Sequence, residues 1–175
     1  PSVGATYEFS DSLNGSVSYK QSFRVPQESN LFRQGANLDS TGLKPVVADS
    51  IEAGLRGRVG PRVMWDLSIY EMNTQDDILT LSSGAGATQT NNGKTRHQGV
   101  EAVLGWLIVP GLRMDLAGSY AKHTYKEWMT SSTVHFNGNE INAAPRKTAN
   151  LTLGYVPRSV PALNMEAEWQ VLGSY

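Results

Sequence analysis

The sequence predicts an all-β protein, an antiparallel up-and-down meander of about eight strands. Apolar and polar residues alternate over many short segments, which is the period of a strand and not of a helix. Short and long connections alternate between these segments along the chain. Mean hydropathy is −0.34. The longest apolar run, near residues 106–109, is far shorter than the roughly 18 residues that a membrane helix needs.

The clearest predicted element is a β-hairpin with arms at residues 96–109 and 112–120. A turn at Val109-Pro110-Gly111 joins the two arms. In the second arm, apolar side chains occupy every second position: Leu112, Met114, Leu116 and Tyr120. The first arm alternates more loosely in the same way, so each arm has one apolar face and one polar or small-residue face.

Six further segments alternate and are predicted as strands: 3–9, 16–23, 49–59, 63–72, 147–156 and 163–175. Tight turns are expected at 11–15, 60–61 and 157–161, where Gly, Pro, Asn and Asp gather. The other connections are long, and we expect them to be irregular: 24–48, 73–95 and 123–145.

This alternation of connection lengths favours a membrane barrel. A compact soluble domain rarely contains several unstructured loops of about 20 residues, whereas outer-membrane barrels have short turns at one end and long loops at the other. The charged residues of each strand lie almost wholly on one face, which in a barrel is the lumen. Aromatic residues near strand ends fit interfacial girdles, although core packing explains them equally well: Trp65, Trp106, Tyr120, Tyr155 and Trp169.

Composition excludes other classes of protein. The net charge is −1 with 18% charged residues, so no nucleic-acid partner is expected. The absence of cysteine excludes disulfides and cysteine zinc sites. No nucleophile elbow, zinc-protease motif or phosphate loop is present. We therefore expect no enzyme activity, no catalytic residue, no metal site and no cofactor.

Five segments, in order along the chain, resemble signatures of the TonB-dependent outer-membrane receptors. The first is SYKQSFRVP at 18–26, and the second joins LKP at 43–45 to SIEAG at 50–54. Val46 stands where this family usually has Glu. The others are DDI at 76–78, NGKTRHQGVE at 92–101 and NAAPRKTANLTLGY at 142–155.

The resemblance implies a 22-stranded transmembrane barrel. Residues 1–175 would be a partial receptor barrel domain from the C-terminal half, without the plug domain and the final strands. The implied function is uptake of a ferric siderophore or a similar chelate across the outer membrane of a Gram-negative bacterium. The implied partners are outer-membrane lipid and the TonB complex, which would act through the plug domain.

A possible ligand site follows from the register of the central hairpin. A three-residue turn pairs Ile108 with Leu112, and the same register sets His97 opposite His123 on the polar face. Two opposed histidines could bind a metal-bearing or anionic ligand, or titrate together, although a hydrated pair without a function is an open alternative. The predicted ligand-binding residues at the outer rim are His97, His123, Arg96 and Lys122. His135 forms no ligand motif with them.

Two other functions stay open at the level of sequence. One is a self-contained eight-stranded barrel with a structural or adhesive role, which needs a closing pair between residues 3–9 and 163–175. The other is a soluble β-sandwich that binds ligand through its loops, in which the apolar faces pack against each other.

Overall fold

The computed structural model describes residues 1–31, 42–83, 86–131 and 133–174. They form one eight-stranded sheet in the order β1-β2-β3-β4-β5-β6-β9-β10, in which every neighbouring pair is antiparallel. The strands are β1 (Ser2–Ser10), β2 (Leu13–Arg24), β3 (Val46–Val59), β4 (Val63–Ser83), β5 (Gly86–Val109), β6 (Leu112–Glu127), β9 (Lys147–Tyr155) and β10 (Met165–Leu172). The predicted meander of eight strands is therefore confirmed.

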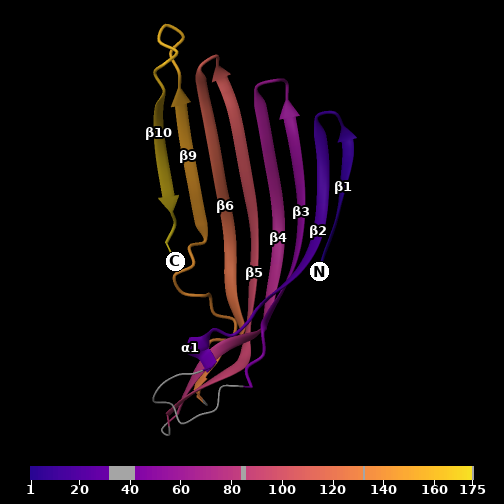
Figure 1. Ribbon diagram of the computed structural model, residues 1–175, viewed down its shortest axis with the longest axis vertical. Helices are drawn as coiled ribbons and strands as arrows, with labels where there is room; N and C mark the ends of the chain where they lie inside the picture. The colour runs from indigo at the N-terminus through magenta and orange to yellow at the C-terminus, as the bar shows by residue number, and fades with distance from the viewer. Residues whose placement is uncertain (32–41, 84–85, 132, 175) are drawn as a thin grey trace.

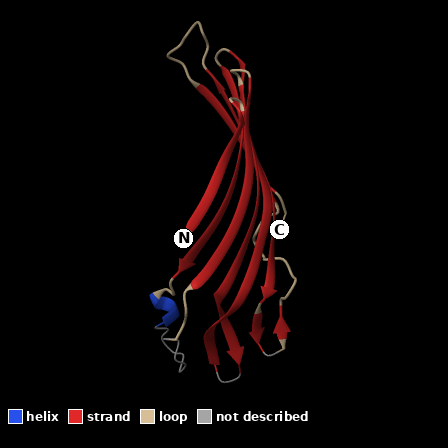
Figure 2. Ribbon diagram, turned by 90° about the vertical axis from the view of Figure 1, so that its right-hand side faces the viewer, coloured by secondary structure: helices blue, strands red, loops and turns tan. Residues whose placement is uncertain are grey.

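The two ends of the sheet differ, as the connection lengths indicated. Figure 1 shows the short turns at one end and the helix α1 (Glu28–Leu31), with the long connections, at the other. A small second sheet pairs β7 (Met129–Ser131) with β8 (Val134–His135) at this long-loop end. In the side view the strands form one curved layer (Figure 2). No helix among the described residues is long and apolar enough to cross a membrane.

The sheet has almost no core of its own. Among the described residues only Val46, Leu79 and Ala121 are buried apolar side chains. Most of the exposed large apolar side chains lie on one face, for example Ile69 and Val171 at 59% each, whereas Met64 and Val103 are exposed on the other. A sandwich would pack two such faces together, and a closed eight-stranded barrel would pair β1 with β10. Neither arrangement occurs in the described part of the chain, where the sheet is a single open layer.

The apolar face has a defined extent along each strand. On β6 it runs over residues 112–120, a length of about nine residues, which matches the 9–11 that a tilted transmembrane strand needs. Beyond it, toward the long-loop end, the first side chain on that face is polar on six successive strands. We call these residues the polar boundary: Gln21, Asp49, Glu71, Gln98, Lys122 and Lys147.

Several predicted bounds were wrong at the long-loop end. The stretch 73–95 is mostly strand, because β4 and β5 continue as a long hairpin, and β6 continues to Glu127. Both faces of this hairpin are polar or mixed, so it lacks the alternation of apolar and polar residues that marks the strand segments nearer the short turns. Its many threonines favour extended backbone. The stretch 24–48 contains α1 and the start of β3, and its residues 32–41 lie outside the described ones.

The turn of the central hairpin is also tighter than predicted. Val109, and not Ile108, pairs with Leu112, and the register shifts between Leu107 and Val109. Gly111 has a φ of 93°, which permits a two-residue turn at Pro110-Gly111. The register shift at Ile108 restores the predicted pairing in the rest of the hairpin, beginning with Leu107 and Arg113.

Candidate functional site

The predicted histidine pair is formed at the long-loop end of the polar face. His97 on β5 and His123 on β6 are direct partners in the ladder, as the register predicted. Their Nδ1 atoms lie 2.7 Å apart and their ring centroids 5.0 Å apart. One ring must donate this hydrogen bond and the other accept it, so the two rings cannot both be protonated while the bond persists.

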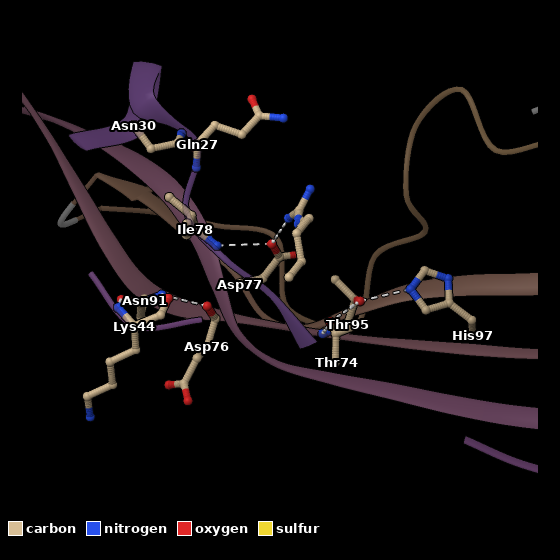
Figure 3. A network of polar contacts seen from close by, with 11 residues as sticks. Gln27, Asn30, Lys44, Thr74, Asp76, Asp77, Ile78, Asn91, Thr95 and His97 are labelled. Carbon is tan, nitrogen blue, oxygen red and sulfur yellow. Dashed lines mark hydrogen bonds and ion pairs between the residues drawn. The ribbon is translucent and has the colours of Figure 1, made fainter. Parts of the chain in front are cut away.

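A chain of hydroxyl groups holds His97 from its other side. The Nε2 atom of His97 lies 2.9 Å from Oγ1 of Thr95, which is itself 2.6 Å from Oγ1 of Thr74. Thr95 is only 5% exposed, and its backbone N–H donates to Thr74 Oγ1 at 3.2 Å. Figure 3 shows Thr74, Thr95 and His97 in line. Both ring nitrogens of His97 are therefore engaged, which fixes the orientation of the ring.

The surroundings favour the neutral form of His97. This residue lies beyond the apolar stretch of β5, at the level of the polar boundary. Burial lowers the pKa of His97 below its ordinary value, the nearby His123 lowers it further, and Asp77 opposes the shift. A neutral pair can share one proton across the 2.7 Å contact, and protonation of both rings would separate them.

This arrangement predicts a loss of stability in acid. Because the folded-state pKa of His97 lies below its unfolded value, its contribution is complete above about pH 6.5 and is lost as the pH falls through the folded value. We expect the thermal unfolding temperature of a receptor that contains this chain to fall between pH 7 and pH 5 by less in His97→Gln than in the unaltered protein. His135→Gln, at an exposed position, is the control and should retain the full dependence. Equal pH dependence in all three proteins would contradict this assignment.

A second cluster ties the connection before β3 to the β4–β5 hairpin. The Asn91 side chain donates from Nδ2 to the carbonyl oxygens of Lys44 (2.9 Å) and Asp76 (2.7 Å) and accepts the Lys44 backbone N–H at 2.7 Å. Asp76 has a φ of 56° and lies within a register shift of β4. Next to it, Asp77 pairs with Arg24 at 3.1 Å and accepts the Ile78 N–H at 3.0 Å (Figure 3). The Asn91 side chain therefore connects three segments at the rim: the connection before β3, strand β4 and its own strand β5.

We expect Asn91→Ala to release this connection. Three hydrogen bonds are lost, each with a net value of about 0.5–1.5 kcal/mol, so local opening near residues 42–46 and 74–78 should become easier by roughly 2 kcal/mol. Amide hydrogen exchange measures this opening directly. Asn92→Ala, at the exposed neighbouring position, should leave exchange unchanged. Unchanged protection in both variants would show that Asn91 does not hold the segments together.

Three half-buried aromatic residues lie beside the histidine pair. Tyr125, the ladder partner of Thr95, has its ring 4.9 Å from that of Trp128 and 6.1 Å from that of Phe136. The Trp128 ring covers Gly93, where a Cβ atom would lie 2.9 Å from Cζ3 of the indole. This cluster was not predicted from the sequence, because its members belong to a polar stretch without alternation. Their proximity in sequence, between 125 and 136, was the available signal.

The four predicted ligand residues are divided between the two faces. His97 and His123 lie on the polar face, whereas Arg96 and Lys122 are each one residue away and leave the sheet on the apolar side. There Arg96 pairs with Glu71 at 2.5 Å, and the Gln98 side chain donates to the same carboxylate at 3.2 Å. This pairing lowers the pKa of Glu71 below its ordinary value, mainly through the hydrogen bond from Arg96. A ligand over the polar face therefore meets the histidines first.

Because both ring nitrogens of His97 are engaged, Nε2 of His123 is the ring nitrogen of the pair without a hydrogen-bond partner among the described residues, and it can bind a metal-bearing molecule. No group of three or more His, Cys, Asp or Glu residues within the described ranges is arranged to hold a bare metal ion. The site suits contact with a ligand that carries its own metal coordination, with a hydrogen bond from the His123 imidazole and stacking on the neighbouring aromatic rings.

Solved structures with the same fold include a copper transporter and two receptors for ferric chelates. The copper transporter OprC matches with a TM-score of 0.73 and 19% identity, over 98% of this chain and 25% of that chain. The ferric yersiniabactin uptake receptor FyuA from Yersinia pestis matches with a TM-score of 0.65 and 21% identity, over 89% and 22%. The ferric-catecholate import receptor Fiu from E. coli matches with a TM-score of 0.69 and 20% identity, over 89% and 22%. The chain thus spans about a quarter of the length of these proteins.

The family model described as TonB dependent receptor-like, beta-barrel matches residues 1–175, the whole chain. Members of this family are transporters of the outer membrane of Gram-negative bacteria. The match agrees with the open antiparallel meander, the one apolar face and the two unlike ends. The chain belongs to the TonB-dependent receptor family and represents part of its β-barrel domain.

Proposed function

We propose that this chain is a stretch of barrel wall in an outer-membrane receptor that takes up a ferric siderophore or a similar metal chelate. In this proposal the apolar face contacts lipid, the polar face lines the lumen, and the long-loop end faces the outside. Further strands complete the barrel, and a plug domain outside these residues engages the TonB complex. The role is transport and not catalysis.

The observation that carries the proposal is the cluster of His97, His123, Tyr125, Trp128 and Phe136 on the polar face at the rim. Imidazole groups can donate to or accept from the oxygen-rich surface of a chelate, and aromatic rings stack on its planar groups. The names of similar solved structures support this class of cargo, because they refer to copper, ferric yersiniabactin and ferric catecholate. The geometry favours contact with cargo for His97 and His123 over Arg96 and Lys122, which leave from the other face.

The test is binding and uptake in a receptor that contains this chain. We expect the double variant His97→Ala/His123→Ala to bind its ferric chelate at least about tenfold more weakly, a loss of about 1.4 kcal/mol. Growth on that chelate as the sole iron source should slow accordingly. His135→Ala is the matched control, since it removes a histidine from the same end without touching the pair, and it should bind normally. Unchanged affinity in the double variant would remove the histidine pair from the proposed site.

A further inference from the structure

His123 carries the open nitrogen of the histidine pair. Its Nδ1 atom faces Nδ1 of His97 at 2.7 Å, whereas its Nε2 atom has no hydrogen-bond partner among the described residues. In the described part of the chain, the buried side-chain nitrogen and oxygen atoms without a partner are Gln89 Oε1 and Arg96 Nε, so Nε2 of His123 is not buried. A ligand over the polar face can reach this atom. The kind of ligand depends on whether Nε2 offers an N–H group or a lone pair.

The tautomer of His123 is tied to a row of hydrogen bonds that begins at Thr74. The row runs from Thr74 Oγ1 to Thr95 Oγ1 at 2.6 Å, then to Nε2 of His97 at 2.9 Å, and then to His123. Figure 3 shows its first part, from Thr74 to His97. In a neutral imidazole one nitrogen donates and the other accepts, so each hydrogen bond fixes the next.

Thr95 lets the row run in only two ways. This residue is 5% exposed, so its hydroxyl hydrogen needs a partner within the protein. It therefore donates to one neighbour, Thr74 or His97, and accepts from the other. All donors of the row consequently point toward His123 or all point away from it.

The backbone of Thr95 decides between these two directions. Its N–H donates to Thr74 Oγ1 at 3.2 Å, so that oxygen is already an acceptor. The Thr74 hydroxyl hydrogen has one acceptor among the described residues, which is Thr95 Oγ1. If Thr74 donates to Thr95, then Thr95 donates to Nε2 of His97, and His97 donates from Nδ1 to Nδ1 of His123. The opposite direction would leave the Thr74 hydroxyl hydrogen without an acceptor.

We propose that Thr74 and Thr95 are positioning residues that hold His123 as an Nε2–H donor, and that this donor binds an anionic oxygen, a carboxylate or a similar oxyanion, on the surface of the cargo. A hydrogen bond to a charged oxygen is stronger than one between neutral groups. The same tautomer has no lone pair on Nε2, so this atom does not coordinate a bare divalent metal ion. The inference rests on the proposed function, because it specifies the surface of the chelate that the histidine pair contacts.

The test measures the tautomers directly, by ¹⁵N NMR of the full receptor labelled at histidine, at a pH well above the ordinary histidine pKa of about 6.5. We expect His97 to carry its proton on Nδ1 and His123 on Nε2, with each signal assigned by its loss in His97→Gln or His123→Gln. Thr95→Val keeps the shape of the side chain and removes the hydroxyl, so each tautomer of His123 should then be populated to roughly half. Thr95→Ser should restore the original tautomer.

Two further variants complete this test. Thr74→Val removes the start of the row and leaves the Thr95 hydroxyl in place, so it should shift the tautomers in the same direction as Thr95→Val. It keeps the test decisive if Thr95→Val does not fold. Thr124→Val is the matched control, because Thr124 adjoins His123 in sequence and its hydroxyl donates to the backbone oxygen of Arg96 at 3.5 Å. This variant should leave both tautomers unchanged.

The ligand class is tested with two probes on the same labelled receptor. One is the citrate complex of Ga³⁺, a diamagnetic counterpart of a ferric carboxylate chelate, and the other is Zn²⁺ alone. We expect the gallium complex to shift the His123 Nε2–H signal. It should bind to Thr95→Val at least about twofold more weakly, since the competent tautomer falls to roughly half. Zn²⁺ should leave the Nε2 proton in place in the unaltered receptor.

Any of four results would overturn the inference: a His123 proton on Nδ1 in the unaltered receptor, unchanged tautomers in both Thr95→Val and Thr74→Val, a His123 signal that the gallium complex does not change, or loss of the Nε2 proton to Zn²⁺. The proposed function fails separately. Normal binding of the ferric chelate by His97→Ala/His123→Ala, with the expected tautomers in the unaltered receptor, would contradict that function. Weakened binding in the double variant, with the His123 proton on Nδ1, would contradict this inference alone.

Discussion

Replacement of Leu116 by Arg is expected to destabilise the barrel by about 2–4 kcal/mol. Leu116 is the central residue of the apolar stretch 112–120 of β6, and 39% of it is exposed. In the proposed orientation this position lies near the midplane of the bilayer, where a guanidinium has no water and no partner. The cost should fall sharply for the same change near the polar boundary, since the penalty depends on depth.

The neighbouring residue provides the control. Ala117 points to the polar face, where its neighbours include the hydroxyl of Ser119 on the same strand and the amide of Asn150, its ladder partner on β9. Ala117→Arg should therefore cost less than about 1 kcal/mol. Reversible unfolding of the receptor in denaturant, in the presence of lipid or detergent, gives both values. Equal costs at 116 and 117 would mean that the two faces have been assigned incorrectly.

Gly111→Ala is expected to have an effect of similar size for a different reason. Gly111 has a φ of 93°, outside the range that alanine tolerates without strain of about 1–2 kcal/mol. An added Cβ would also lie 2.4 Å from the backbone oxygen of Val156, whose N–H donates to the Gly111 oxygen at 2.8 Å. Backbone atoms cannot yield as a side chain can, so overpacking adds about 1–3 kcal/mol.

Gly60 separates the two causes. It also has a positive φ, 59°, but a Cβ there would meet nothing within 4 Å. Gly60→Ala should thus cost only about 1 kcal/mol, whereas Gly111→Ala should cost roughly 2–5 kcal/mol. The same unfolding measurement applies to both. If the two variants were equally stable, the contact with Val156 would not constrain the turn.

Much of the fold could be predicted because the strand segments between the short turns and the polar boundary follow one physical rule. Where one face meets apolar surroundings and the other is polar, every second residue is constrained, and the pattern of residues 112–120 is visible in the sequence. The register followed from the same rule, which placed His97 opposite His123 correctly in spite of the wrong turn at Ile108.

The rim could not be predicted in this way. On the long-loop side of the polar boundary, both faces of a strand meet polar surroundings. Alternation of apolar and polar residues therefore no longer distinguishes β4 or β5 from an irregular loop there. The connection made by Asn91 depends on Lys44 and Asp76, which are distant in sequence and carry no periodic signal. The faces of Arg96 and Lys122 were in principle predictable, because each is adjacent to a histidine assigned to the opposite side.

The central claim is that the apolar face of this sheet meets lipid and the polar face meets water. The most direct test places a spin label at cysteines introduced singly at residues 113–124 of β6, in a receptor that contains this chain, and measures collisions with oxygen and with a water-soluble nickel complex. We predict that collisions with oxygen are more frequent for labels at Met114, Leu116 and Gly118. Collisions with the nickel complex should be more frequent for labels at Arg113, Asp115 and Ala117. From Lys122 onward, the nickel complex should reach labels on both faces. Uniform accessibility along residues 113–120, or the reverse alternation, would contradict the claim.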